Sequence, residues 1–165
     1  MDSLSRPINN LLEINNNYEH DISLYCEILS YLPFFEDAKE KDYIIYHKDH
    51  SFEYTAQFYS FIKALFDSKM VEDVDVMTRF LSEYQSESAY NMWIKDMNTV
   101  LSNNDYVQKV NICFIKKAFF SMIKLEKVMP GSWGIDVETG NWLKLLKQLQ
   151  KILPDIYKCE KSSMN

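Results

Sequence analysis

All three glycines of this 165-residue chain, Gly131, Gly134 and Gly140, lie within ten residues of one another. Glycine is the residue that most readily adopts a positive φ or lets another segment approach the backbone closely. Two of the three tryptophans, Trp133 and Trp142, lie inside this stretch or just after it. The pattern predicts a tight elbow between the last two helices, with the tryptophans packed across it and Gly131 or Gly140 at positive φ.

Apolar residues recur at helical spacing along most of the chain. From Phe52 to Ser68 they follow the i, i+4, i+7, i+8 pattern of a helix with one buried face. The Tyr43–Tyr46 stretch alone has strong β propensity, and because one strand cannot form a sheet we expect an extended, packed segment. With three Gly and four Pro the chain has too few turns for a many-stranded barrel. Other helices are predicted over residues 8–14, 22–32, 74–84, 93–101, 106–125 and 141–153.

These segments predict an all-α, compact single domain of six or seven helices. The domain spans residues 1–157, with 1–7 as a loose N-terminal arm and 158–165 as a flexible tail. Pro33 is predicted to end the helix before it, because the residue before proline is pushed out of the α region. Phe34 and Phe35 then anchor a loop, and Asp49 or Ser51 caps the helix that follows.

Three features indicate a soluble, cytoplasmic protein. The N-terminus lacks the basic and apolar regions of a signal peptide. No apolar run approaches the roughly 18 residues that cross a membrane, so no membrane association is expected. The three cysteines are an odd number, widely spaced and without a CxxC pair, as in a reducing compartment.

The net charge of −6 is unevenly distributed along the chain. Residues 1–105 hold 19 Asp and Glu against 8 Lys and Arg, whereas residues 106–165 hold 5 against 10. This layout argues against direct nucleic-acid binding, which needs a basic surface. It favours attraction between the two parts of the chain, or a partner met through one charged face. Unequal but merely solvated helix faces remain the alternative.

Residues that could carry catalysis are few. His47 and His50 could hold a metal with Glu36 or Asp37, but they lack the HExxH spacing, and a polar turn is the simpler interpretation. Ser132 follows Gly131 directly without the GxSxG pattern of a nucleophile elbow. No Gly-Lys-Ser/Thr follows the glycines, so a phosphate loop is not indicated. The sequence therefore predicts no catalytic residue, no metal and no cofactor.

Two further clusters have two interpretations each. Glu72, Asp73 and Asp75 stand at a predicted helix start, where carboxylates complement the helix dipole, and the EF-hand pattern that would favour a cation site is missing. Trp93 lies in YNMWIKDM, and tryptophan with methionine and tyrosine is typical of interfaces. Helical spacing favours a place for Trp93 in the core, but the interface alternative stays open.

The LPFFE stretch from Leu32 to Glu36 and the glycine elbow together resemble a family of small bacterial and phage proteins filed as a domain of unknown function. Phe52–Phe66 is similar to that family's aromatic helix, and Leu143–Leu149 to its leucine-rich closing helix. The similarity covers roughly residues 24–153. Lys127-Val128 stands where the family tends to have Arg-Phe, and no tryptophan pair occurs in the middle helix. The resemblance implies no activity, cofactor or catalytic residue.

The sequence favours a non-catalytic protein-binding factor, such as a small bacterial or phage inhibitor, immunity or anti-defence protein. It would dock through an acidic and aromatic surface on a protein with a basic surface. The alternatives are a small enzyme with an unrecognised His/carboxylate site and a structural or oligomerising helical module, and a homodimer stays open. The predicted binding residues are Phe35, Glu36, Asp37, Glu72, Asp73, Asp75 and Trp93.

Overall fold

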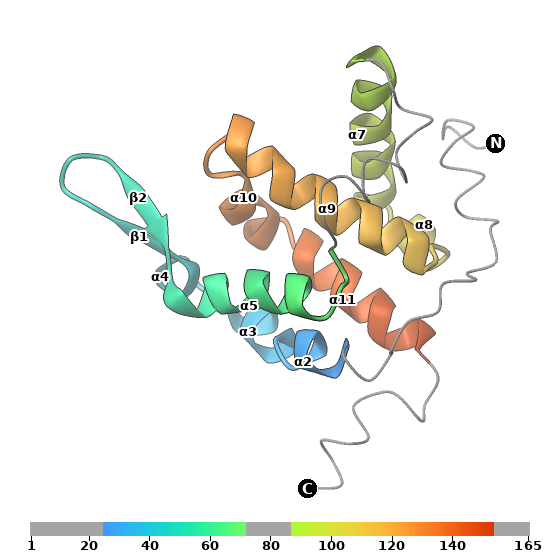
Figure 1. Cartoon of the computed structure of the whole chain (residues 1–165), viewed down its shortest axis with the longest axis horizontal. Coiled ribbons are helices and arrows are strands. Elements are labelled where there is room, and N and C mark those ends of the chain that lie inside the picture. The colour runs from blue at the N-terminus through green and yellow to red at the C-terminus, as the bar shows by residue number, and fades with distance from the viewer. Residues whose placement is uncertain (1–24, 72–86, 154–165) are drawn as a thin grey trace, which may run out of the picture.

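The computed structural model describes residues 25–71 and 87–153. These residues are mostly helical with one two-stranded hairpin, which confirms the predicted all-α class (Figure 1). The predicted N-terminal arm, the helices over 8–14 and 74–84 and the C-terminal tail lie outside the described residues. In chain order the elements are α2 (Tyr25–Leu29), α3 (Leu32–Asp37), α4 (Glu40–Tyr43), β1 (Ile44–Tyr46), β2 (Phe52–Tyr54), α5 (Ala56–Asp67), α7 (Glu87–Leu101), α8 (Asn104–Val107), α9 (Ile112–Val128), α10 (Ser132–Glu138) and α11 (Asn141–Ile152).

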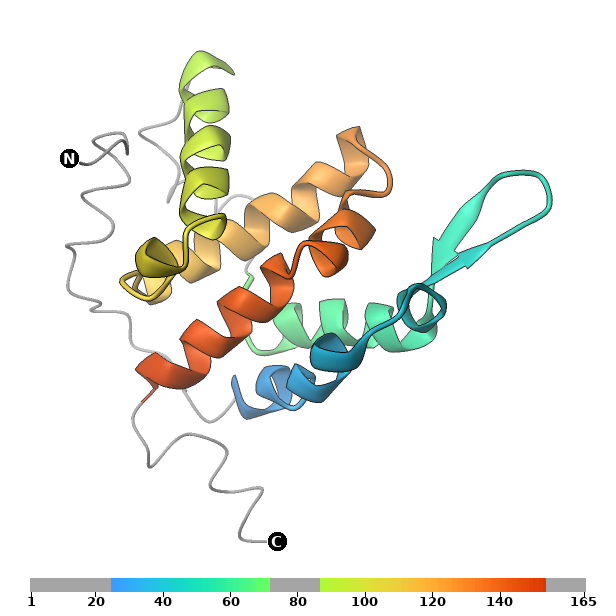
Figure 2. The same ribbon diagram turned by 180° about the vertical axis from the view of Figure 1, so that it is seen from behind.

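Helix α9 is the centre of the described structure. All its residues from Ile112 to Met122 are buried, so neighbours cover it on every side. Helix α11 contacts α9 and α10 and also reaches α2, α3 and α8 (Figures 1 and 2). Helix α5 lies with α2 and α4, whereas the hairpin extends away from the helical body.

Aromatic rings join these helices into one core. Trp142 of α11 has no exposed surface and lies within ring-contact distance of four phenylalanines from α3, α5 and α9. Its ring centroid is 5.9 Å from Phe119, in a stacked arrangement, and 5.5 Å from Phe61, edge to face. Such pairs add specific geometry to the burial of large apolar area. The other two partners are Phe35 at 6.3 Å and Phe58 at 5.8 Å.

Pro33 begins a helix instead of ending one. It stands in the first turn of α3, where its missing N–H needs no partner and its fixed φ suits the helix. The preceding helix α2 stops at Leu29. Phe34 and Phe35, predicted to anchor a loop, therefore lie on α3 and pack edge to face at 4.9 Å.

The Tyr43–Tyr46 stretch is paired with a second strand. Strand β1 pairs with β2 in an antiparallel register that places Ile44 opposite Tyr54 and Tyr46 opposite Phe52. The helix predicted from Phe52 therefore begins at Ala56, and its cap is Thr55, whose hydroxyl oxygen accepts from the Phe58 N–H at 3.3 Å. The predicted caps Asp49 and Ser51 lie in the hairpin loop.

The helices in the last third of the chain are interrupted at two more places than predicted. Asn111 caps α9 through its side-chain oxygen, which accepts from the Phe114 N–H at 3.0 Å, so residues 106–125 are not one helix. The elbow itself contains the short helix α10. Gly131 and Gly140 have φ of 98° and 79°, which confirms the predicted positive φ, and they stand at the N-caps of α10 and α11.

Candidate binding site

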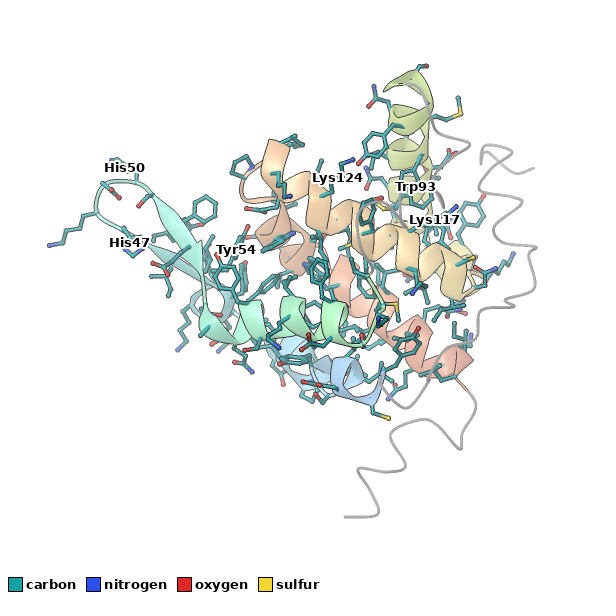
Figure 3. The ribbon with its side chains drawn as sticks, viewed as in Figure 1. His47, His50, Tyr54, Trp93, Lys117 and Lys124 are labelled. Atoms are coloured by element: carbon teal, nitrogen blue, oxygen red, sulfur yellow. The ribbon has the colours of Figure 1, made fainter. Side chains whose placement is uncertain are left out.

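The β1–β2 hairpin carries aromatic residues on one face. Successive strand residues point to opposite faces, so Ile44 and Tyr46 share a face with their partners Phe52 and Tyr54. Ile44 and Tyr54, nearest the helices, are buried, whereas the exposed fraction of Tyr46 is 61%. Figure 3 shows Tyr54 at the base of the hairpin, with the loop histidines at its far end.

Tyr54 attaches the hairpin to the elbow. Its ring lies 5.2 Å from the Phe58 ring and 5.2 Å from the Trp133 ring. Its hydroxyl donates to Glu126 Oε1 at 2.9 Å and accepts from the Gly134 N–H at 3.4 Å. Burial is the main cause that raises the pKa of Tyr54, and the hydrogen bond to Glu126 and the charge of Glu126 raise it further.

Glu126, near the end of α9, connects three elements. Besides Tyr54, it accepts from the Gly131 N–H and the Trp133 N–H, each at 2.9 Å, and from the Ser132 hydroxyl at 3.3 Å. It thus caps α10 and fixes the direction in which the chain leaves α9. All four donors are neutral. Within the part of the chain that the structure describes, no cationic side chain forms an ion pair with this carboxylate.

A cleft of about 490 Å³ lies between the hairpin, α5 and the elbow. Phe52, Tyr54, Tyr59 and Trp133 supply its aromatic rings, and Glu126 supplies a carboxylate. Glu53 also lines the cleft, but its side chain shares the opposite face of the hairpin with Ile45. Tyr59 is 48% exposed, so this aromatic surface is open to a ligand. The remaining lining residues are His50, Ser51 and Pro130.

Exposed apolar side chains adjoin the cleft. Tyr46 lies 6.4 Å from the Phe52 ring, and Val128 and Met129 directly precede Pro130. Val128 is 74% exposed and Met129 is 55% exposed. We call the cleft together with Tyr46, Val128 and Met129 the hairpin–elbow surface.

The four predicted binding residues that the structure describes do not lie on this surface. Phe35 is buried in the aromatic core, so its predicted role as an exposed contact is wrong. Trp93 has no exposed surface, and its indole N–H donates to the Ser121 hydroxyl at 2.7 Å, so the core alternative is correct (Figure 3). Glu36 and Asp37 are exposed on α3, and Glu36 Oε2 lies 3.9 Å from Lys147 Nζ. The remaining three, Glu72, Asp73 and Asp75, lie outside the described residues.

The loop histidines are not brought together with the carboxylates considered for a metal site. His47 Nε2 lies 2.8 Å from Glu53 Oε2, and His50 occupies a left-handed conformation with φ of 70°. Glu36 lies near α11 instead. Over residues 25–71 and 87–153, no group of three or more His, Cys, Asp or Glu side chains could hold a metal ion.

A second groove, of about 300 Å³, lies between α8 and α11 and is basic. Lys144, Lys147 and Lys151 line it, together with Gln108 and Gln148. The Lys144 ammonium donates to the Leu101 carbonyl at 2.8 Å, which leaves Lys147 and Lys151 as its exposed charges.

The hairpin–elbow surface was not predicted from the sequence, although the sequence contains a pattern that indicates the hairpin. Two runs with β-forming residues, residues 43–46 and 52–54, flank the polar segment HKDHS, a pattern typical of a hairpin. No comparable sequence pattern indicates the role of Glu126, because that role depends on the conformation of the turn after α9.

The chain matches no known protein family, no curated protein and no solved structure. Among the helices of the described ranges, none has the length and apolar character needed to cross a membrane.

Proposed function

We propose that this protein is a non-catalytic binding protein that docks on a protein partner through the hairpin–elbow surface. The supporting observation is the open aromatic cleft bordered by the exposed side chains of Tyr46, Val128 and Met129. Contiguous exposed apolar area marks interaction sites, and aromatic residues and methionine are enriched in interfaces. Glu126 gives the cleft a carboxylate whose hydrogen-bond donors are all neutral, which suits a partner with a basic surface.

The narrower hypothesis of an inhibitor or anti-defence protein rests on the charge distribution, with its excess of acidic residues over residues 1–105. In that form, docking would block the partner's activity by occupying a basic channel. The test is whether the purified protein lowers the activity of the partner that the experiment below identifies.

A competing docking face is the basic groove between α8 and α11. Its lysines suit an acidic partner. The two faces differ in charge and lie on different elements, so one experiment compares them directly.

That experiment places a photo-crosslinking amino acid at Tyr59 or Met129, or at Lys151 in the competing groove. Phe66, an exposed apolar residue of α5 that does not line the cleft, provides the matched control position. In an extract of the source cells, we expect one partner to crosslink from Tyr59 and Met129 but not from Phe66. Unlabelled protein should compete for that partner, and a Met129→Asp variant should compete poorly. Crosslinking from Lys151 alone would show that the docking surface is assigned wrongly.

A further inference from the structure

We propose that the cleft binds the guanidinium group of an arginine on the docked partner, between the aromatic rings and the Glu126 carboxylate. This inference rests on the proposed docking function and specifies the side chain that the surface recognises.

Two rings of the cleft, Tyr59 and Trp133, are accessible to a planar cation, whereas Tyr54 is buried behind them. Trp133 lies 5.2 Å from Tyr54 and 6.4 Å from Tyr59, and the two tyrosine rings are 6.2 Å apart and nearly perpendicular, at 82°. The cleft therefore presents ring faces in more than one orientation. Cations are attracted to the faces of tryptophan and tyrosine, and a guanidinium group also stacks flat on them.

The carboxylate of Glu126 supplies a charge that the described residues do not neutralise. Its four hydrogen-bond donors are backbone or hydroxyl groups. Oε1 accepts three of these bonds, whereas Oε2 accepts only the one from the Gly131 N–H. A carboxylate oxygen has about two lone pairs, so Oε2 can accept another hydrogen bond, and a charged donor forms the stronger one.

The other charged groups at the cleft favour the same ligand. His50 is the only basic residue among the lining residues described. Glu53, which contacts His47 at 2.8 Å on the opposite face of the hairpin, adds acidic charge to β2. Burial raises the pKa of Asp136 on α10, and the charge of Glu126 raises it further.

A guanidinium fits these features better than other occupants. An apolar side chain would remove water from Glu126 without supplying a hydrogen bond, which is unfavourable for a carboxylate. An ammonium group is a compact, strongly hydrated charge that cannot stack on rings as a planar group does. Arginine combines the two interactions, ring stacking and donation to a carboxylate.

Tryptophan indole signals in ¹H–¹⁵N spectra provide the test. Trp93 and Trp142 are fully buried, whereas Trp133 lines the cleft, so the three signals separate the core from the site. We expect N-acetyl-arginine amide to shift the Trp133 signal in a saturable way. Compared with the arginine compound, the neutral citrulline analogue should bind at least about fivefold more weakly. The lysine analogue should also bind more weakly than the arginine compound.

Two variants separate charge from ring contact. Glu126→Gln keeps one oxygen that can accept from Tyr54 and from the Trp133 N–H, places an amide NH2 at the position of Oε2 and removes the charge. It should weaken arginine binding about fivefold or more. Tyr59→Leu removes one ring without changing the bonds of Glu126, and should weaken binding as well. Glu36→Gln, on the exposed side of α3, is the matched control. Unchanged Trp93 and Trp142 signals show that each variant is folded.

Equal affinity for arginine and citrulline, stronger binding of lysine, or an unmoved Trp133 signal would each overturn the guanidinium assignment. If crosslinking from Tyr59 persists in that case, the docking proposal stands and the arginine inference alone fails. If arginine binds but no partner crosslinks, the docking proposal fails while the preference of the cleft for guanidinium is retained.

Discussion

The three glycines of the elbow have different roles at the level of single residues. Gly131 and Gly140 adopt left-handed backbone conformations at the N-caps of α10 and α11. Gly134 lies inside α10 without a positive φ, and a Cβ there would be 3.4 Å from Cε2 of Tyr43, an ordinary contact distance. Only the first two positions need glycine for their backbone conformation.

Alanine substitutions should therefore separate the three positions. Gly131→Ala and Gly140→Ala should each lower the free energy of unfolding by about 1 kcal/mol or more, because a Cβ disfavours positive φ. Gly134→Ala should be neutral or stabilising by up to about 1 kcal/mol, since alanine is the better helix former. Urea unfolding of the three variants measures this order. Equal losses at all three positions would contradict it.

Asp136 of α10 makes stability depend on pH. Burial raises its pKa from 3.8 to about 6, the charge of Glu126 adds to the rise, and a hydrogen bond at 2.8 Å from the Asn141 amide opposes it. Because the folded-state pKa lies above the unfolded value, the folded state binds the proton more tightly. The resulting stabilisation is full below pH 3.8 and is lost as pH rises through about 6.

Asp136→Asn should abolish this pH dependence. Asparagine stays neutral and keeps an oxygen that accepts from Asn141. The variant should exceed the wild-type protein in unfolding free energy above pH 6 by up to about 3 kcal/mol, and the difference should shrink toward pH 4. Chemical unfolding across this pH range tests the expectation. Parallel pH profiles for the two proteins would show that Asp136 is not the responsible group.

At the scale of elements, strong hydrophobic periodicity predicted the long helices well. The positions of short helices and of helix ends were predicted poorly. The helix around Trp93 and the closing helix from Asn141 were found because each buries one long apolar face. Helix α10 was missed because SWGIDVE is short and contains a glycine, so it has little intrinsic helicity. The start of α9 was misplaced because Val110 and Ile112 continue the apolar pattern across the break that Asn111 makes.

For the candidate site, the sequence supported an expectation about the types of residue but not about which residues form the surface. An acidic and aromatic surface was expected, but sequence does not tell which aromatic residues face outward. Phe35 and Trp93 lie in helices whose apolar faces are covered by α5 and α9, whereas Tyr59 lies on the uncovered side of α5. The partners of Glu126 come from segments up to 72 residues away, so no local pattern indicates them.

The attachment of the hairpin gives a prediction at the same scale. Tyr54→Phe removes the hydroxyl that donates to Glu126, a loss of about 1 kcal/mol for a partly buried hydrogen bond. We expect faster amide hydrogen exchange over residues 44–54, with unchanged protection over residues 112–122 of α9. Tyr46→Phe, at an exposed position of the same hairpin, is the control. Loss of protection in both regions would show that the hairpin and core unfold as one unit.

At the scale of the whole molecule, an exposed ion pair joins the two oppositely charged parts of the chain. Glu36 of α3 and Lys147 of α11 form this ion pair at 3.9 Å, with side chains that are 48% and 58% exposed. Exposed pairs of this kind contribute on the order of 0–1 kcal/mol. The exposed carboxylates of Glu36, Asp37 and Glu53 can therefore contribute to long-range attraction to a basic partner.

Charge reversal tests this expectation once a partner is identified. Glu53→Lys together with Asp37→Lys should slow association about tenfold at low salt, and added salt should reduce the difference. Reversal of Lys147 and Lys151 in the basic groove should leave association as fast or faster. Association rates at several ionic strengths provide the measurement. Slower association only after lysine reversal would assign docking to the basic groove.

The position of Trp142 in the chain determines when this core can form during synthesis. The rings that surround it come from α3, α5 and α9, all of which leave the ribosome before α11 does. Until α11 emerges, Phe35, Phe58, Phe61 and Phe119 lack the side chain that joins them. A nascent chain with incompletely buried aromatic surface is prone to aggregate. The emergence of α11 from the ribosome is thus the step at which the aromatic rings can close around Trp142, and it ends the period in which their exposure favours aggregation.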